Sequence, residues 1–293
     1  MSFFPTISKY LSLVKFAHTV FALPFALIGF FLGLADNNSR IELNLFILIL
    51  LCMVFARNAA MGFNRYIDRK YDQKNPRTIK REIPAGIIKP AAVIVFVIFN
   101  MICFITTTYF INEICFYLSP VAMMVVLGYS LTKRFTFLCH FILGLGLSLA
   151  PIGAYLAVTG HFALFPVLYS FVVLFWVSGF DIFYALQDIE FDKSQKLKSI
   201  PVLLGVKRSL WVSGVLHLVA SIIIVLLGIE IGYGFLYWTG TIIFIALLFY
   251  EHIVVKPSDL SRVNQAFATM NGIASVVFGI FVIAELIVDN FMK

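Results

Sequence analysis

The stretch NRYIDRKYD, residues 64–72, combines an amide and two carboxylates at a spacing that can do chemistry. Asn64, Asp68 and Asp72 are four residues apart, and side chains at this spacing lie along one face of a helix, about 6 Å from one to the next. Two carboxylates on one face repel each other unless a cation lies between them. The row therefore indicates either a solvated helix end, paired with neighbouring basic residues, or a site for a cation.

A second row of the same kind occurs in the other half of the chain, in YALQDIEFD. Tyr184, Asp188 and Asp192 again lie four residues apart, and the two aspartates follow Asp68 and Asp72 by 120 positions. Both rows come at the end of an apolar run and lead into a basic segment. This arrangement favours a degenerate internal repeat, in which two carboxylate-bearing helices face one shared site.

Carboxylate oxygens suit a hard cation such as Mg²⁺, which keeps some water and accepts phosphate oxygens as its other ligands. Basic residues near the two rows are then expected to hold the remaining phosphate oxygens. These residues are Arg77, Lys80, Arg81, Lys133, Arg134 and Lys198. The combination predicts a magnesium–diphosphate site, in which positive charge stabilises a departing diphosphate.

The elements that position these residues are apolar helices. The chain is 61% hydrophobic and 13% charged, whereas soluble domains carry about 25% charged residues. Its apolar runs are continuous and do not alternate, which disfavours a β-barrel. Nine such runs occur, at about 16–35, 43–66, 91–110, 114–131, 137–158, 164–187, 209–229, 233–251 and 265–288. We predict an all-α polytopic membrane protein with about nine transmembrane helices around a central cavity.

The whole chain, 1–293, is expected to be one transmembrane domain with two carboxylate-motif halves, roughly 1–135 and 136–293. Nine crossings with a cytosolic N-terminus place most of the basic residues on the cytosolic side, as the positive-inside rule demands. The opposite side keeps only Arg40 and Lys293. The net charge of +7 thus reflects topology, and we expect the lipid bilayer, and no nucleic acid, as a partner.

Three polar residues inside the apolar runs are further candidates for the site. Arg57 lies two turns before Asn64 and about 10 Å deeper; it either makes a structural pair or grips an aromatic carboxylate in a bidentate manner. Asp181, two turns before Asp188, is expected just inside the membrane boundary. Asn271 either lines an acceptor pocket or makes a hydrogen bond between helices.

The histidines and cysteines suggest no second metal site. The four cysteines are scattered and form no CxxC pair. The histidines lie on different segments without ligand spacing, so we expect packing or interfacial roles for them. They are His18, His140, His161, His217 and His252.

An anionic head site at a membrane face, above an apolar body, predicts a lipid diphosphate whose isoprenoid tail runs between helices. At this point the chain resembles the UbiA superfamily of membrane prenyltransferases. The family's signatures NDxxDxxxD and YxxxDxxxD correspond to NRYIDRKYD and YALQDIEFD, and the likeness continues through NPRTIKREIPAG and YSLTKRFT. One position departs from the pattern, because the usual second acid of the first signature is Arg65.

The resemblance implies Mg²⁺-dependent transfer of a polyprenyl chain from polyprenyl diphosphate to a small aromatic acceptor, in the inner membrane of a bacterium. It assigns the metal to Asp68, Asp72, Asp188 and Asp192, and an acceptor-side arginine to Arg57. Asn64, Arg77, Arg81, Lys133, Tyr184, Lys198 and Asn271 are the other expected substrate contacts. Asp181 or Asp188 is expected to remove the ring proton.

Several alternatives stay open at the level of sequence. The likeness is strongest to the 4-hydroxybenzoate polyprenyltransferase branch, which serves ubiquinone biosynthesis. Relatives that prenylate 1,4-dihydroxy-6-naphthoate for menaquinone fit equally, because both acceptors carry a carboxylate on an electron-rich ring. A cation or proton-coupled transporter is the alternative outside this class, although it would place its carboxylates near the membrane midplane. The length of the prenyl chain and the oligomeric state do not follow from the sequence.

Overall fold

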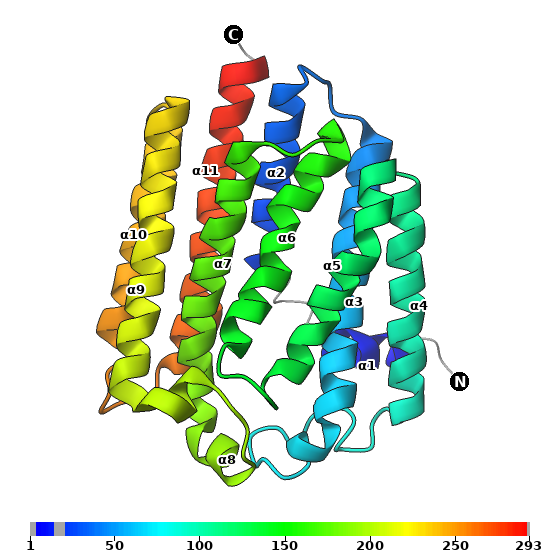
Figure 1. The fold of residues 1–293 in the computed structure, drawn as a ribbon, viewed down its shortest axis with the longest axis vertical. Coiled ribbons are helices and arrows are strands. Elements are labelled where there is room, and N and C mark those ends of the chain that lie inside the picture. Colours follow the sequence, from blue (N-terminus) through cyan, green and yellow to red (C-terminus); the bar gives the residue numbers. More distant parts are fainter. Residues whose placement is uncertain (1–3, 15–20, 292–293) are drawn as a thin grey trace.

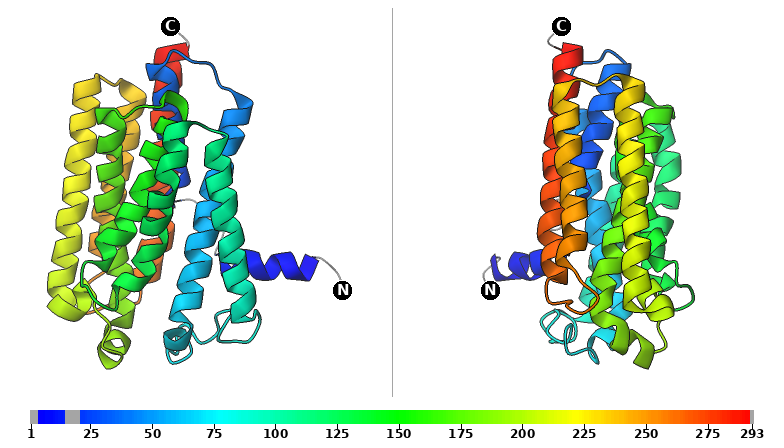
Figure 2. Two further views of the ribbon diagram at one scale, coloured as in Figure 1. Left: turned by 45° about the vertical axis from the view of Figure 1, so that its right-hand side comes forward. Right: turned by 90° about the vertical axis from the view of Figure 1, so that its left-hand side faces the viewer.

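The computed structural model describes residues 4–14 and 21–291. Long helices run along a common direction, and a short N-terminal helix runs roughly perpendicular to them and projects from the side of the bundle (Figures 1 and 2). The helices are α1 (Phe4–Leu13), α2 (Leu23–Asp36), α3 (Leu43–Asp72), α4 (Pro90–Tyr109), α5 (Glu113–Thr132), α6 (Cys139–Thr159), α7 (Leu164–Ala185), η2 (Leu186–Asp188), α8 (Ile189–Ser194), α9 (Ile200–Ile231), α10 (Phe235–Val254), η3 (Gln265–Met270) and α11 (Asn271–Phe291).

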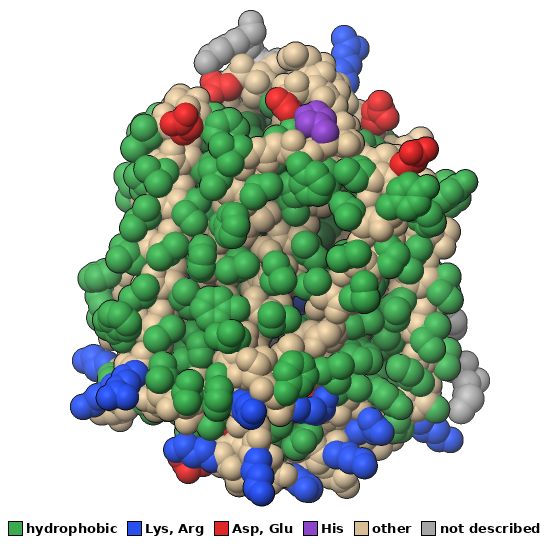
Figure 3. Space-filling view, in the orientation of Figure 1, with side chains coloured by type: hydrophobic (Ala, Val, Ile, Leu, Met, Phe, Trp, Pro, Cys, Tyr) green, Lys and Arg blue, Asp and Glu red, His purple; other side chains and the backbone are tan. Residues whose placement is uncertain are grey.

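The helices have the length and surface of membrane spans. Eight helical segments within the described residues are long and apolar enough to cross a membrane, and α2 is a shorter apolar helix. Large apolar side chains face outward, among them Phe235 at 81% and Trp211 at 71% exposure. Figure 3 shows that, on the face in view, hydrophobic side chains cover the middle of the body, with most basic side chains at one end and most acidic ones at the other. The protein is therefore a polytopic α-helical membrane protein, as predicted.

Most predicted spans match a helix, and the deviations occur at the ends. The helix predicted for 209–229 is the longer part of α9, because α9 breaks at Gly205, whose φ of 73° is left-handed. The short part before the break begins at Ile200, since Ser199 accepts a hydrogen bond from the backbone N–H of Val202 at 3.3 Å and Pro201 occupies the first turn of α9. The longer part ends at Gly232, whose φ of 76° is left-handed. The first predicted span, 16–35, begins in 16–20, outside the described residues, and α2 forms its remainder.

The largest core of the bundle is aromatic and lies between α2, α7, α10 and α11. Trp176 is fully buried at its centre. Its ring centroid lies 5.4 Å from that of Phe25 and 5.7 Å from that of Phe244, while Phe25 and Phe278 lie 5.8 Å apart. Tilted and edge-to-face pairs of this kind add to the packing that holds helices together in a membrane.

The two helices that carry the carboxylate rows end at the same end of the bundle, the basic end in Figure 3. The first row lies on the last turns of α3, as predicted. The second does not lie on one regular helical face, because α7 ends at Ala185 and the tighter turn η2 precedes α8. A 3₁₀ turn has three residues per turn, so Asp188 is rotated relative to the position that a continuous α-helix would give it.

Candidate active site

A cavity of about 980 Å³ opens at the basic end of the bundle and contains both carboxylate rows. Asp68, Asp72, Asp188 and Asp192 all line it, together with Asp181. Farther in, its walls are mostly apolar. On α6 the lining extends from Cys139 to Ala157, which corresponds to about 27 Å at 1.5 Å per residue. The cavity thus has a polar mouth that leads into a long channel with apolar walls.

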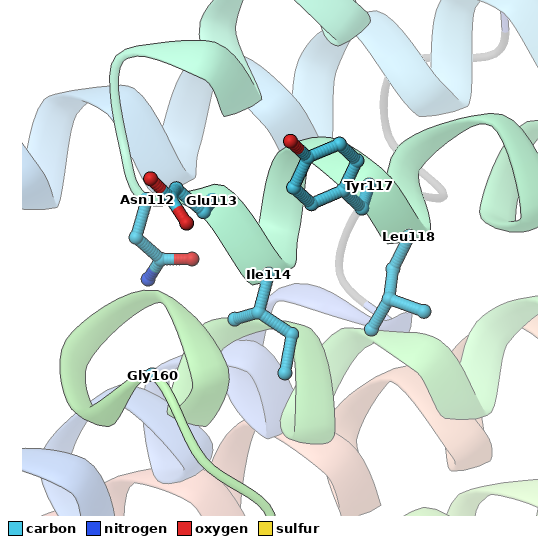
Figure 4. A pocket seen from close by; sticks show the side chains of 6 residues that line it. All are labelled: Asn112, Glu113, Ile114, Tyr117, Leu118 and Gly160. Carbon is cyan, nitrogen blue, oxygen red and sulfur yellow. The ribbon is translucent and has the colours of Figure 1, made fainter.

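A second hollow lies at the opposite end of the bundle, where α5 begins and α6 ends. It measures about 470 Å³ and is lined by Asn112, Glu113, Ile114, Tyr117, Leu118 and Gly160 (Figure 4). None of the residues of the two motifs borders it. Its few polar groups do not form a site comparable with the mouth of the large cavity.

Asp68 is held by one residue from its own helix and one from the loop after α5. Asn64 donates a hydrogen bond from Nδ2 to Oδ2 at 3.1 Å, and Arg134 donates from Nη2 to Oδ1 at 2.8 Å. The same Nη2 reaches the carbonyl oxygen of Ile67 at 3.2 Å. Asn64 therefore orients the first aspartate of its own row, and its contact with substrate stays a prediction.

Asp72 ends α3 and faces the polar loop that follows. Arg81 donates from Nη1 to its Oδ1 at 2.7 Å. Its Oδ2 is buried and accepts no hydrogen bond within the described part of the chain. A buried carboxylate oxygen without a partner is costly in a folded protein, so this atom is suited to a ligand that brings positive charge.

Asp188 receives its partners from the loop of the first half. Arg77 donates to both carboxylate oxygens, and Asn75 donates from Nδ2 to Oδ1 at 3.1 Å. Nη1 of Arg77 also donates to the hydroxyl of Tyr184 at 2.7 Å, and its guanidinium lies over the ring of Tyr184. Burial by itself lowers the pKa of the Arg77 guanidinium, but these contacts outweigh it and raise that pKa above its usual value.

Asp192 is almost fully buried and pairs with Lys133, whose Nζ lies 2.6 Å from Oδ2. Burial lowers the pKa of the Lys133 ammonium, whereas the attraction of Asp192 and the hydrogen bond to it raise the pKa by more, so the net shift is upward. All four aspartates of the two rows thus pair with a basic side chain that follows α3 or α5.

Two residues predicted to bind substrate lie outside the cavity lining. Nζ of Lys198 donates to the carbonyl oxygen of Phe135 at 3.1 Å and braces the loop that carries Lys133. Asn271 is fully buried between helices, where it donates to Glu251 at 2.7 Å and accepts from Trp176 at 2.6 Å. The alternative of a hydrogen bond between helices is the one that the structure supports for Asn271.

Two arginines line the cavity below the carboxylates. Arg57 lies on α3, and its Nη2 donates to the carbonyl oxygen of Val14 at 3.4 Å. Arg65, at the position where the family pattern has an acid, is 5% exposed. Its Nε is buried without a hydrogen-bond partner among the described residues. The departure in the sequence therefore adds a buried positive charge to the cavity wall.

His140 is a site residue that the sequence did not reveal. Its Nε2 accepts a hydrogen bond from the backbone N–H of Ile200 at 3.3 Å, so Nδ1 carries the ring hydrogen. Nδ1 lies 2.7 Å from Oδ2 of Asp181 and donates to it. Both residues line the cavity. The carboxylate of Asp181 inside the membrane-spanning helix is thereby hydrogen-bonded, which its position in the sequence cannot indicate.

The donor set at the mouth fits a hard divalent cation. The four aspartates offer oxygen atoms only, which Mg²⁺ prefers, and the orphaned Oδ2 of Asp72 is one such donor. The basic side chains between them match the phosphate oxygens that such a cation would bring.

Comparison with known proteins agrees with this geometry. Residues 22–273 match the model of the UbiA prenyltransferase family. The chain belongs to the UbiA prenyltransferase family. It is 26% identical over 232 residues to the 4-hydroxybenzoate octaprenyltransferase of Aliivibrio fischeri (strain MJ11), covering 79% of this chain and 80% of that protein. The corresponding enzyme of Saccharophagus degradans is 29% identical over 245 residues, 83% and 81% of the two chains.

Solved structures of UbiA homologues have the same fold. The apo structure of a UbiA homologue from Aeropyrum pernix K1 has a TM-score of 0.78 and 28% identity, and covers 93% of this chain and 98% of that one. A homologue from Archaeoglobus fulgidus bound to GPP and Mg²⁺ has a TM-score of 0.72 at 23% identity, with 95% and 99% covered. The protein is thus a membrane prenyltransferase of the UbiA family, and the transporter alternative is set aside.

Proposed function

We propose that this UbiA protein transfers a polyprenyl chain from polyprenyl diphosphate to an aromatic carboxylic acid of the 4-hydroxybenzoate type. The observation that carries the proposal is the single cavity, in which two carboxylate rows and their basic partners lie above a channel with apolar walls. The curated relatives named 4-hydroxybenzoate octaprenyltransferase support the same acceptor class. We further propose that it acts in the inner membrane of a bacterium, in respiratory quinone biosynthesis.

The diphosphate is bound at the mouth. Arg77, Arg81 and Lys133 hold its oxygens, and each of them is already positioned by an aspartate of the two rows. Asp68, Asp72, Asp188 and Asp192 would hold Mg²⁺, whose charge, when bound, stabilises the leaving diphosphate. The allylic carbon–oxygen bond breaks and the diphosphate departs with the bonding electrons, as positive charge on several sides favours.

The prenyl tail occupies the apolar channel. The lining along α6 gives it about 27 Å of depth, which suits a chain of several isoprene units. Aromatic residues on the wall, including Phe180 and Phe267, present faces that stabilise the allylic cation left behind. Water is kept from this cation by the same apolar walls.

The acceptor is held by its carboxylate. Arg57 lines the cavity deeper than the aspartates and offers a planar fork that matches a carboxylate. The ring carbon beside the hydroxyl then attacks the allylic carbon, so a carbon–carbon bond forms and the ring must lose a proton.

Asp181 is the better candidate for the base that takes this proton. His140 donates a hydrogen bond to only one carboxylate oxygen of Asp181, which leaves the other oxygen able to accept a proton. Both oxygens of Asp188, by contrast, accept hydrogen bonds from Arg77 or Asn75. His140 orients the carboxylate of Asp181 by this hydrogen bond and is a positioning residue.

Product analysis tests the proposal. Purified protein in lipid nanodiscs is incubated with Mg²⁺, radiolabelled polyprenyl diphosphate and either 4-hydroxybenzoate or 1,4-dihydroxy-6-naphthoate. We expect a labelled 3-polyprenyl-4-hydroxybenzoate product and free diphosphate. Labelled naphthoate alone would assign the other acceptor, and label in neither acid would refute transfer to an aromatic acid.

A further inference from the structure

A second cluster of metal-ligating side chains lies away from the cavity, between α9 and α10. His217 and Glu251 are 3% and 1% exposed, and His252 is half-buried. One ligand atom from each of the three lies within 4.8 Å of the others. None of the three lines the cavity. This cluster is not apparent from the sequence, because His217 lies 35 positions before His252 and on a different helix.

The hydrogen bond of His217 to Trp176 leaves at least two lone pairs in the cluster facing each other. Nε2 of His217 lies 3.2 Å from the carbonyl oxygen of Trp176, which can only accept, so this nitrogen carries the ring hydrogen. In the neutral ring, Nδ1 then bears a lone pair. It faces Oε1 of Glu251 at 2.8 Å and Nε2 of His252 at 3.0 Å. Nδ1 of His217 and Oε1 of Glu251 repel one another unless positive charge lies between them, and Nε2 of His252 adds a third lone pair when its ring hydrogen is on Nδ1.

The carboxylate oxygen in the cluster has no other partner. Oε1 of Glu251 is buried and accepts no hydrogen bond within the described residues. Oε2, by contrast, accepts a hydrogen bond from Nδ2 of Asn271 at 2.7 Å. The carboxylate is therefore oriented by one oxygen and presents the other, deeply buried, to the two imidazoles.

The surroundings resemble the outer shell of a metal site. A metal-binding histidine usually donates its other ring hydrogen to a carbonyl or carboxylate, and ligating carboxylates are themselves hydrogen-bonded. Here the carbonyl of Trp176 orients His217, and Asn271 orients Glu251. Nε1 of Trp176 in turn donates to Oδ1 of Asn271 at 2.6 Å, so the same two residues fix both ligands.

The neighbouring backbone provides the room that the imidazoles need. A Cβ added at Gly179 would overlap the ring of His217, and one at Gly214 would lie 3.6 Å from Cε1 of His252. The rings thus pack directly against the helices that carry these glycines. Their positions are set by the packing of α7 and α9, before any ligand binds.

We propose that His217, Glu251 and His252 form a binding site for a divalent transition metal of the zinc class. Two imidazole nitrogens and one carboxylate oxygen are a donor set that zinc accepts and magnesium does not prefer. The donor chemistry therefore separates this site from the aspartates at the mouth. A metal there ties α9 to α10, and through the outer shell to α7 and α11. The competing arrangement is a proton, which would make His217 an imidazolium paired with Glu251.

Metal analysis of the full chain decides between these. The purified protein is stripped with a chelator, incubated with ZnCl₂, freed of excess metal, and its zinc is counted by mass spectrometry. We expect about one zinc per chain that is lost in His252→Ala and in Glu251→Gln. His161→Ala, at the other end of the bundle, and an Asp68→Asn/Asp188→Asn variant should retain it. Far-ultraviolet circular dichroism and gel filtration establish that each variant is folded.

X-ray absorption provides the second readout. In the loaded wild-type protein we expect imidazole nitrogens at roughly 2.0–2.1 Å from zinc, and this contribution should vanish in His252→Ala. A wild-type protein that binds no zinc would overturn the proposal in favour of the shared proton. Zinc that persists in both His252→Ala and Glu251→Gln, or that disappears only in the aspartate variant, would overturn it as well.

Discussion

Asn75 donates a hydrogen bond to Asp188 at 3.1 Å across 113 positions of the chain. Asn75 follows the first carboxylate row by three residues, and Asp188 is the middle of the second row. This contact, with the ion pair between Arg77 and Asp188, joins the two halves into one site.

Arg57→Ala should weaken binding of the aromatic acceptor far more than binding of the prenyl diphosphate. A hydrogen bond to a charged group contributes ~1.5–3 kcal/mol, so the acceptor KM should rise by about 10- to 150-fold. The donor KM should change little, because Arg57 lies below the diphosphate-binding residues. Steady-state kinetics with each substrate varied separately measures this. Equal effects on the two KM values would remove Arg57 from the acceptor site.

Asp181→Asn should lower kcat by roughly 10²- to 10⁴-fold, the usual contribution of a general base. His140→Ala should lower kcat less, because it removes only the group that positions Asp181. With a ring-deuterated acceptor, the isotope effect on kcat should grow in both variants as proton removal becomes rate-limiting. An unchanged isotope effect together with wild-type turnover would exclude Asp181 as the base.

Gly153→Phe should shorten the prenyl chain that the enzyme accepts. Gly153 lines the cavity, and a Cβ there would meet nothing within 4 Å, so a large side chain projects into open space. The ratio of kcat/KM for short over long prenyl diphosphates should rise about tenfold or more. The added ring fills part of the channel, so the end of a long tail can no longer be buried there. Gly128→Phe, which is equally unobstructed but outside the lining, is the control. A parallel loss for all chain lengths would argue against a tail channel along α6.

The ion pair between Lys133 and Asp192 should stabilise the fold in a defined pH range. The pKa of Lys133 is raised above its usual 10.5, so its contribution is fully present below that pH and is lost as the pH rises through the higher folded value. The difference in Tm between wild type and Lys133→Met should stay constant from about pH 6 to 9 and shrink above about pH 10.5. Lys198→Met, which loses a contact to a backbone carbonyl only, serves as control. A difference that already disappears near neutral pH would contradict the pairing.

Much of the fold could be predicted because a membrane simplifies the problem. Continuous apolar runs bounded by charge must become helices, and the spacing of Asp68 and Asp72 survives intact on α3. The sequence does not predict the break at Leu186–Asp188, because the local residues favour a continuous helix. The tighter turn is stabilised by contacts with the loop after α3, such as the hydrogen bond from Asn75 to Asp188. The division into halves 1–135 and 136–293 stays a prediction.

The contacts of the site that the sequence does not predict share one physical cause. Polar side chains in the site form hydrogen bonds with residues that are distant in sequence, and the spacing of residues within one helix does not predict these partners. Lys198, expected as a substrate contact, donates to a carbonyl oxygen, and of the two roles considered for Asn271 the structure has the hydrogen bond between helices, to a buried carboxylate. His140 looked like a packing residue, although its partner Asp181 lies 41 positions away on the next helix.

The most direct test of the account is the binding of polyprenyl diphosphate in the presence of Mg²⁺ to three variants in nanodiscs. Asp72→Asn and Asp192→Asn, one from each half, should each weaken binding by roughly 10²-fold. Glu190→Gln, beside Asp192 but 90% exposed, should bind as the wild type does. If either aspartate variant kept wild-type affinity, the two rows would not serve one diphosphate site, and the account would be wrong.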